Sequence, residues 1–165
     1  MDEIYKSAFE IFPRYITAMY NGCLNTGVFP MRSKRTKLVP ITKPGKDKSE
    51  DVSKFRPISL INKGGNVLEK LLINRINHHV FSHNYMNKNQ YEFTPQKSTT
   101  DAAMTVKNVV TYGLTAGDVL VIISLDVKGA CDAAWWPAIL KGLRAYECPN
   151  NLFNLARSYL RMGTV

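Results

Sequence analysis

The stretch "VLVIISLDVKGACDAAWWP", residues 119–137, is decisive for the fold class. Within this stretch an apolar run ends at a carboxylate. Residues 119–125 are apolar except for Ser124 and rich in β-branched side chains, so they predict a buried β-strand. Asp126 follows this strand directly. A buried carboxylate is unfavourable unless a helix N-terminus, a basic side chain or a metal ion meets it.

Asp126 has two interpretations. A carboxylate at the end of a buried strand is held rigidly and faces an open turn, which suits a hard cation. A magnesium site, however, needs a second carboxylate together with substrate phosphates. The alternative is that Asp126 or Asp132 caps the helix entered near Trp135, and for Asp132 capping is the favoured interpretation. The residues alone leave both interpretations open for Asp126.

The surrounding sequence alternates helical patterns with one further strand. Residues 37–42, "KLVPIT", predict an edge strand, because a proline cannot donate a ladder hydrogen bond. Apolar residues at helical spacing, together with proline, glycine and capping signals, predict the helices. The boundary signals are Pro13, Gly27, Asn66 with Glu69, Ser98 with Asp101, Gly113, Pro137 and Pro149. The predicted fold class is therefore α+β.

Composition restricts the possible classes of protein. A length of 165 residues with 45% hydrophobic residues fits one globular domain or a piece of a larger one. The longest apolar run is too short to span a membrane, and the acidic, amphipathic first residues do not resemble a signal peptide. Three cysteines without CxxC spacing argue against a disulfide framework or a zinc site, and they predict a reducing compartment.

Positive charge is concentrated in one part of the chain. Of the net charge of +9, residues 31–75 contribute +8, from 12 Lys/Arg against 4 Asp/Glu. Such a block is typical of proteins that bind a phosphate-rich partner. The alternative is a solvated, lysine-rich surface. Aromatic and proline residues within and beside the block argue against a disordered tail.

Four motifs and a helix occur in a fixed order: "LVPITKPGKD", "KFRPISL", the helix, "NQYEFTPQKSTTDAA" and "SLDVKGACDAAWWPAIL". In this order and spacing the chain resembles the reverse transcriptases of non-LTR (LINE-type) retrotransposons, in particular those of arthropod type-1 elements. The resemblance extends from the N-terminal helices to "LARSYLR". It implies a polymerase right-hand fold, with residues 1–118 in the fingers and residues 119–165 at the start of the palm.

The resemblance also implies roles for single residues. Asp126 corresponds to the catalytic, first metal-binding carboxylate, and the backbone carbonyl of Val127 to a further ligand. The residues implied for the incoming nucleotide are Lys43, Arg56 and Cys131, and those implied for the template strand are Lys97, Ser98 and Thr99. Cations around the triphosphate are what phosphoryl transfer requires, and a helix start binds phosphate readily. The alternative for Lys43 and Arg56 is generic surface charge.

The sequence departs from the family pattern in four places. Cys131 stands where a bulky aromatic residue normally excludes a 2′-hydroxyl, Glu92 stands where glycine is usual, and Asn66 stands where lysine is usual. The sequence ends at Val165, before the position at which the family has the acidic loop with its remaining metal ligands. It contains no pair of adjacent aspartates. We therefore expect this piece to be incomplete, and inactive as a polymerase when it is alone.

The function implied is that of an RNA-directed DNA polymerase domain. It implies Mg2+, an RNA template, a DNA primer, deoxynucleoside triphosphates, the remainder of the Pol polyprotein in cis, and action in the nucleus after cytoplasmic synthesis. One alternative is a non-catalytic nucleic-acid-binding remnant of a decayed element. Another is an unrelated metal-dependent phosphotransferase, against which the finger motifs argue.

Overall fold

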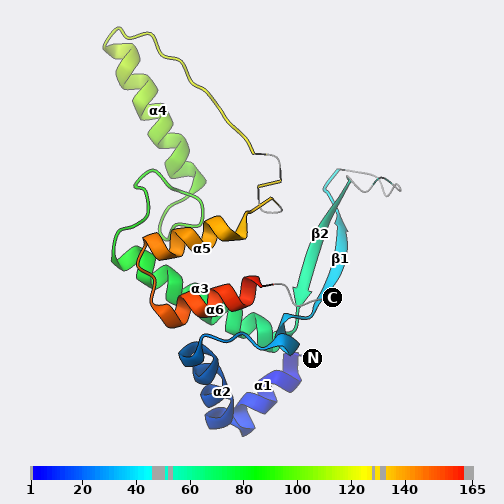
Figure 1. Cartoon of the computed structure of the whole chain (residues 1–165). Helices are drawn as coiled ribbons and strands as arrows, with labels where there is room; N and C mark the ends of the chain where they lie inside the picture. Colours follow the sequence, from blue (N-terminus) through cyan, green and yellow to red (C-terminus); the bar gives the residue numbers. More distant parts are fainter. Residues whose placement is uncertain (1, 46–50, 52–53, 128, 131–132, 162–165) are drawn as a thin grey trace. The chain divides into compact units, whose positions relative to one another are not determined.

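The computed structural model describes residues 2–45, 51, 54–127, 129–130 and 133–161. The chain divides into two units, one formed by Met1–His79 with Trp136–Val165 and the other by Val80–Trp135. Helices predominate, and the sheet of the described residues is a two-stranded antiparallel hairpin (Figure 1). This combination of helices with a small sheet confirms the predicted α+β class. None of the helices in the described residues is long and apolar enough to span a membrane.

The first two helices end where the sequence predicts. Helix α1 (Asp2–Ile11) gives way to α2 (Pro13–Thr26), which has Pro13 in its first turn. Gly27 ends α2 in the left-handed conformation, with φ of 67°, and its N–H donates to the carbonyl of Cys23. A side chain at Gly27 would also meet Asn154, because its Cβ would lie 2.6 Å from that of Asn154. Glycine is therefore required at this position by both conformation and space.

The basic part of the chain forms a hairpin. After a short 3-10 turn, η1 (Met31–Lys34), strand β1 (Thr36–Thr42) pairs antiparallel with β2 (Phe55–Ile61). The register places Thr36 opposite Ile61 and Thr42 opposite Phe55. The predicted edge strand at residues 37–42 is thereby confirmed.

Helix α3 (Lys63–Ser82) begins earlier than the sequence suggested. Asn66 with Glu69 predicted its N-terminus, but Asn66 lies inside the first turn, and that prediction is wrong. Asn62 caps the helix instead, with its Oδ1 accepting the N–H of Gly65 at 2.8 Å. The physical reason is that the Asn62 side chain satisfies an N–H of the first turn, so the helix begins before Asn66.

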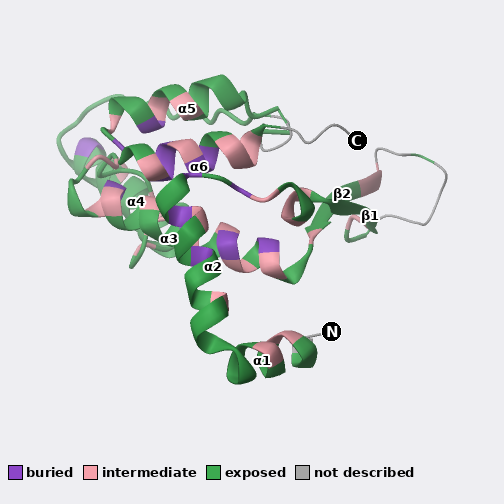
Figure 2. Cartoon of the chain, turned by 60° about the horizontal axis from the view of Figure 1, so that its bottom comes forward, coloured by how far each residue is buried: buried purple, intermediate pink, exposed green. Residues whose placement is uncertain are grey.

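The core of the first unit joins segments far apart in the sequence. Helix α6 (Asn150–Leu160) packs against α2 and against α5 (Trp136–Ala145), and Figure 2 shows buried residues on α2, α3 and α6. The most deeply buried side chains are Leu155, Phe29 and Leu68, with exposed fractions of 0%, 1% and 1%. Polar contacts reinforce the packing, since Tyr159 donates to Glu69 at 2.7 Å. Helices from both ends of the chain therefore complete a single hydrophobic core.

The second unit contains α4 (Thr99–Thr115) and the extended residues after it. Residues 119–125 predicted a buried strand, and this prediction is wrong for the described residues. They form no strand, and their side chains are exposed, from 38% at Leu120 to 95% at Val119. Leu120 is the least exposed because it lies against Gly113 of α4. Apolarity alone does not bury a strand; a neighbouring strand or helix must cover it.

Candidate nucleotide and nucleic-acid interface

Lys43 and Arg56, the residues predicted to hold a triphosphate, lie on one face of the hairpin. The N–H of Lys43 donates to the carbonyl of Lys54 at 2.9 Å, which continues the pairing of β1 with β2 by one position. Side chains directly opposite each other share a face, and so do residues two apart on one strand. Lys43, Lys54 and Arg56 therefore project from the same face near the loop end of the hairpin, with Arg56 exposed and Lys43 partly buried.

Asp126 lies at the end of the extended segment that follows α4, and it is exposed, as is Val127. An exposed carboxylate followed by a backbone carbonyl offers two hard oxygen ligands of the kind that Mg2+ prefers. Within the described residues, no three His, Cys, Asp or Glu side chains gather as a metal site would require. This part of the chain thus fits a divalent cation only in part, with one carboxylate.

The predicted template contact, Lys97–Thr99, lies at the start of α4. The Lys97 amine lies 5.0 Å from the centre of the Tyr91 ring and donates to the carbonyl of Lys88. The Ser98 hydroxyl donates to the Asp101 carboxylate at 2.6 Å and accepts the N–H of Asp101 at 3.2 Å. The helix start therefore already carries an acidic partner, which competes with any phosphate for the same N–H groups.

The capping of α4 makes its stability depend on pH. Hydrogen bonds from the Ser98 side chain, and then from its backbone, hold the pKa of the Asp101 carboxyl below its usual value. Such a group stabilises the folded state above its unfolded pKa of about 4, and this stabilisation is lost as pH falls through the lower folded value. We expect the amide protection of residues 99–115, corrected for intrinsic exchange, to fall below about pH 4.

Hydrogen exchange followed by mass spectrometry tests this expectation. Ser98→Ala should reduce the protection of α4 at neutral pH and flatten its dependence on pH. Thr115→Ala, at the other end of the same helix, is the matched control and should keep the dependence. An identical pH profile for Ser98→Ala and the unchanged chain would contradict the role of this cap.

Sequence reasoning missed the aromatic residues beside the predicted template contact. The Tyr91 hydroxyl lies 2.6 Å from that of Thr105, so Tyr91 links the loop to α4 as well as supporting Lys97. Phe93 is 88% exposed and has a positive φ of 56°, which is uncommon for a bulky residue. The signal for both was present in "NQYEFTPQKST", where aromatic residues alternate with polar ones.

The predicted site residues are divided between the two units. Lys43 and Arg56 belong to the first unit, while Asp126, Val127 and Lys97–Thr99 belong to the second. Cys131, predicted to contact the nucleotide sugar, and Asp132, predicted to cap a helix, lie outside the described residues.

Comparison with known proteins identifies the family. Residues 41–165 match the family described as "Reverse transcriptase (RNA-dependent DNA polymerase)". This match includes the end of β1, all of β2, the start of α4 and the Asp126 segment, and it covers more than half of the chain. The chain belongs to the reverse transcriptase family.

The relatives come from mobile elements of insects. The RNA-directed DNA polymerase from mobile element jockey of Drosophila funebris is 30% identical over 145 residues, which are 88% of this chain and 16% of that protein. The Pol polyprotein from type-1 retrotransposable element R1 of Bradysia coprophila is 29% identical over 157 residues, 95% of this chain and 15% of that protein. The chain thus spans about one sixth of the length of the curated relatives it matches. The resemblance to retrotransposon reverse transcriptases is confirmed.

Proposed function

We propose that this chain forms the fingers, residues 1–118, and the first part of the palm, residues 119–165, of a polymerase right hand in a non-LTR retrotransposon Pol protein. The proposed activity, RNA-templated DNA synthesis, belongs to the complete Pol protein. The observation that carries the proposal is the family match over residues 41–165, which includes every predicted site residue, from Lys43 to Cys131. The partners proposed are an RNA template, a DNA primer and deoxynucleoside triphosphates, and the proposed compartment is the nucleus.

Lys43 and Arg56 are the proposed triphosphate ligands. The charge of the transferred phosphoryl group is stabilised mainly by preorganised cations, because the protein has little covalent chemistry to perform. Two cations on one face of a hairpin are held at a fixed spacing by the backbone ladder. This arrangement supports a role in which Lys43 supplies a point charge and Arg56 a planar fork of donors for phosphate oxygens.

Asp126 and the Val127 carbonyl are the proposed ligands from this chain for a divalent cation, with Mg2+ as the proposed ion. Because this region supplies one carboxylate, the remaining ligands must come from the substrate phosphates and from other parts of Pol. When bound, such ions neutralise developing charge on the reacting phosphoryl oxygens. The role of Asp126 itself is to supply a negatively charged oxygen ligand to that cation.

The proposed template contact rests on Lys97 and Thr99 more than on Ser98. The Ser98 hydroxyl is already engaged with Asp101, whereas Thr99 is exposed and Lys97 is half-buried against Tyr91. Lys97 and Thr99 would position the RNA backbone without reading its sequence.

Primer extension by a chimaera tests the proposal. Residues 1–165 would replace the matching segment of the jockey polymerase, and DNA synthesis would be measured on an RNA template with a DNA primer. We expect template-dependent product. Lys43→Ala and Arg56→Ala should each raise the KM for deoxynucleotides about tenfold or more, because each removes a charge-assisted hydrogen bond.

Lys37→Ala is the matched control, since it removes a lysine from β1 at the other end of the same hairpin. Its KM should stay close to that of the unchanged chimaera. A chimaera that binds RNA but extends no primer would favour the alternative, a non-catalytic nucleic-acid-binding remnant. Equal KM values for Lys37→Ala, Lys43→Ala and Arg56→Ala would make the two predicted ligands ordinary surface charge.

A further inference from the structure

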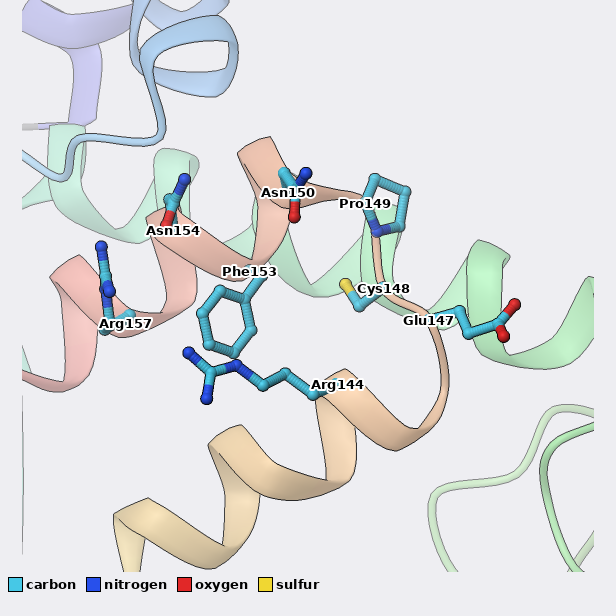
Figure 3. Close-up of a pocket in the computed structure, with 8 residues that line it drawn as sticks. All are labelled: Arg144, Glu147, Cys148, Pro149, Asn150, Phe153, Asn154 and Arg157. Atoms are coloured by element: carbon cyan, nitrogen blue, oxygen red, sulfur yellow. The ribbon is translucent and has the colours of Figure 1, made fainter.

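A pocket of about 470 Å³ lies where α5 turns into α6, within the first unit (Figure 3). Arg144, from the last turn of α5, and Arg157, from α6, are among the residues that line it. Neither residue belongs to the proposed nucleotide, metal or template groups. The function proposed above therefore leaves this pocket unexplained.

The two guanidinium groups are held by one aromatic ring. The Cζ of Arg144 lies 4.6 Å from the centre of the Phe153 ring, and the Cζ of Arg157 lies 5.9 Å from it. Phe153 is 8% exposed, so its ring is a fixed part of the core and not a mobile surface group. Both arginines are exposed, and cation–π contact with a fixed ring restricts their long side chains before any ligand arrives.

No carboxylate of the described residues pairs with either guanidinium. Glu147 also lines the pocket, but Figure 3 shows its carboxylate directed away from the two arginines. Cys148 adds no negative charge, because burial raises the pKa of its thiol. The pocket thus holds two positive charges that pair with no carboxylate of the described residues.

We propose that this pocket binds a backbone phosphate of a nucleic-acid strand, as a contact separate from the proposed nucleotide and template residues. One arginine fork engages both oxygens of a carboxylate in a single plane, whereas the oxygens of a tetrahedral phosphate point in several directions. Two arginines that come from two different helices match the tetrahedral group better. The amide of Asn154, at the same pocket, can add a hydrogen bond. A volume of this size admits a sugar-phosphate unit and not only a small ion.

Fluorescence anisotropy with the full 165-residue chain tests the proposal. The probe is a labelled single-stranded RNA of about 20 nucleotides at about 50 mM salt. The double variant Arg144→Gln with Arg157→Gln should weaken binding about tenfold more than the control Lys70→Gln with Lys141→Gln, which removes two exposed lysines outside the pocket. The slope of log K against log salt should become shallower by about 0.7 in the pocket variant, as expected for one lost phosphate contact.

Further arms identify the ligand and check the fold. Arg144→Lys with Arg157→Lys keeps both charges but removes the forks, so it should bind RNA with intermediate affinity while keeping the far-UV circular dichroism of the unchanged chain. An unlabelled RNA should compete for the pocket far more strongly than inorganic phosphate or an acidic peptide of equal charge. The proposal is overturned if the glutamine variant binds RNA like its lysine control. It is also overturned if the acidic peptide is the better competitor and only its binding depends on the two arginines.

Discussion

Asp126→Ala is expected to reduce primer extension by the chimaera about 100-fold or more. The carboxylate is the only metal ligand side chain that we assign to this chain, and metal ions contribute several kcal/mol of charge stabilisation in phosphoryl transfer. Each 1.4 kcal/mol corresponds to a factor of ten in rate. The measurement is single-turnover extension at saturating nucleotide, which separates loss of rate from loss of nucleotide binding.

Asp118→Ala is the matched control for this variant. Asp118 is also an exposed aspartate after α4, but it lies at the start of the extended segment and not at its end. The extension rate of Asp118→Ala should stay within a few-fold of the rate of the unchanged chimaera. RNA binding should be unchanged or slightly tighter in Asp126→Ala, because a negative charge is removed. A rate for Asp126→Ala equal to that of the control would remove Asp126 from the proposed site.

Gly65→Ala is expected to lower the free energy of unfolding by about 2–3 kcal/mol. A Cβ atom at Gly65 would lie 2.5 Å from the carbonyl oxygen of Ser33 and 2.8 Å from the Ile61 side chain. The carbonyl belongs to the backbone, so it cannot turn away as the end of a long side chain can. The first turn of α3 would have to move away from η1 and β2. Urea unfolding followed by far-UV circular dichroism measures the change.

Gly22→Ala supplies the opposite expectation. Gly22 lies within α2, and nothing lies within 4 Å of the place that its Cβ would occupy. Alanine there should stabilise the chain by about 0.5–1 kcal/mol, because it raises helix propensity without a clash. If both variants shift stability in the same direction, close approach is not the reason for glycine at position 65.

Much of the fold followed from local patterns in the sequence. Pro13 and Gly27 mark helix boundaries through fixed backbone preferences, and the Ser98–Asp101 capping box forms as expected. The predictions failed where the outcome depends on distant segments. Asn66 carried a capping signature, but Asn62 caps the helix instead. Local sequence also does not reveal how closely Gly65 approaches Ser33.

The sequence predicted which residues belong to the candidate site, but not which parts of the chain surround them. The positions of Lys43 and Arg56 in their motifs suggested a shared role, and the hairpin register places them on one face. The burial predicted for the strand before Asp126 depends on a partner strand, and no stretch of the described residues lies beside it as one. Likewise, the arginines around Phe153 come from two helices and form no motif that sequence spacing could reveal.

The division of the first unit between both ends of the chain has a consequence for synthesis on the ribosome. Leu155 belongs to a core to which α2 and α3 contribute residues before His79. Roughly 50 to 60 residues of the second unit are translated in between. At a synthesis rate of about 5–20 residues per second, the apolar faces of α2 and α3 stay uncovered for several seconds. We therefore expect the nascent chain to expose these apolar faces until α6 emerges from the ribosome.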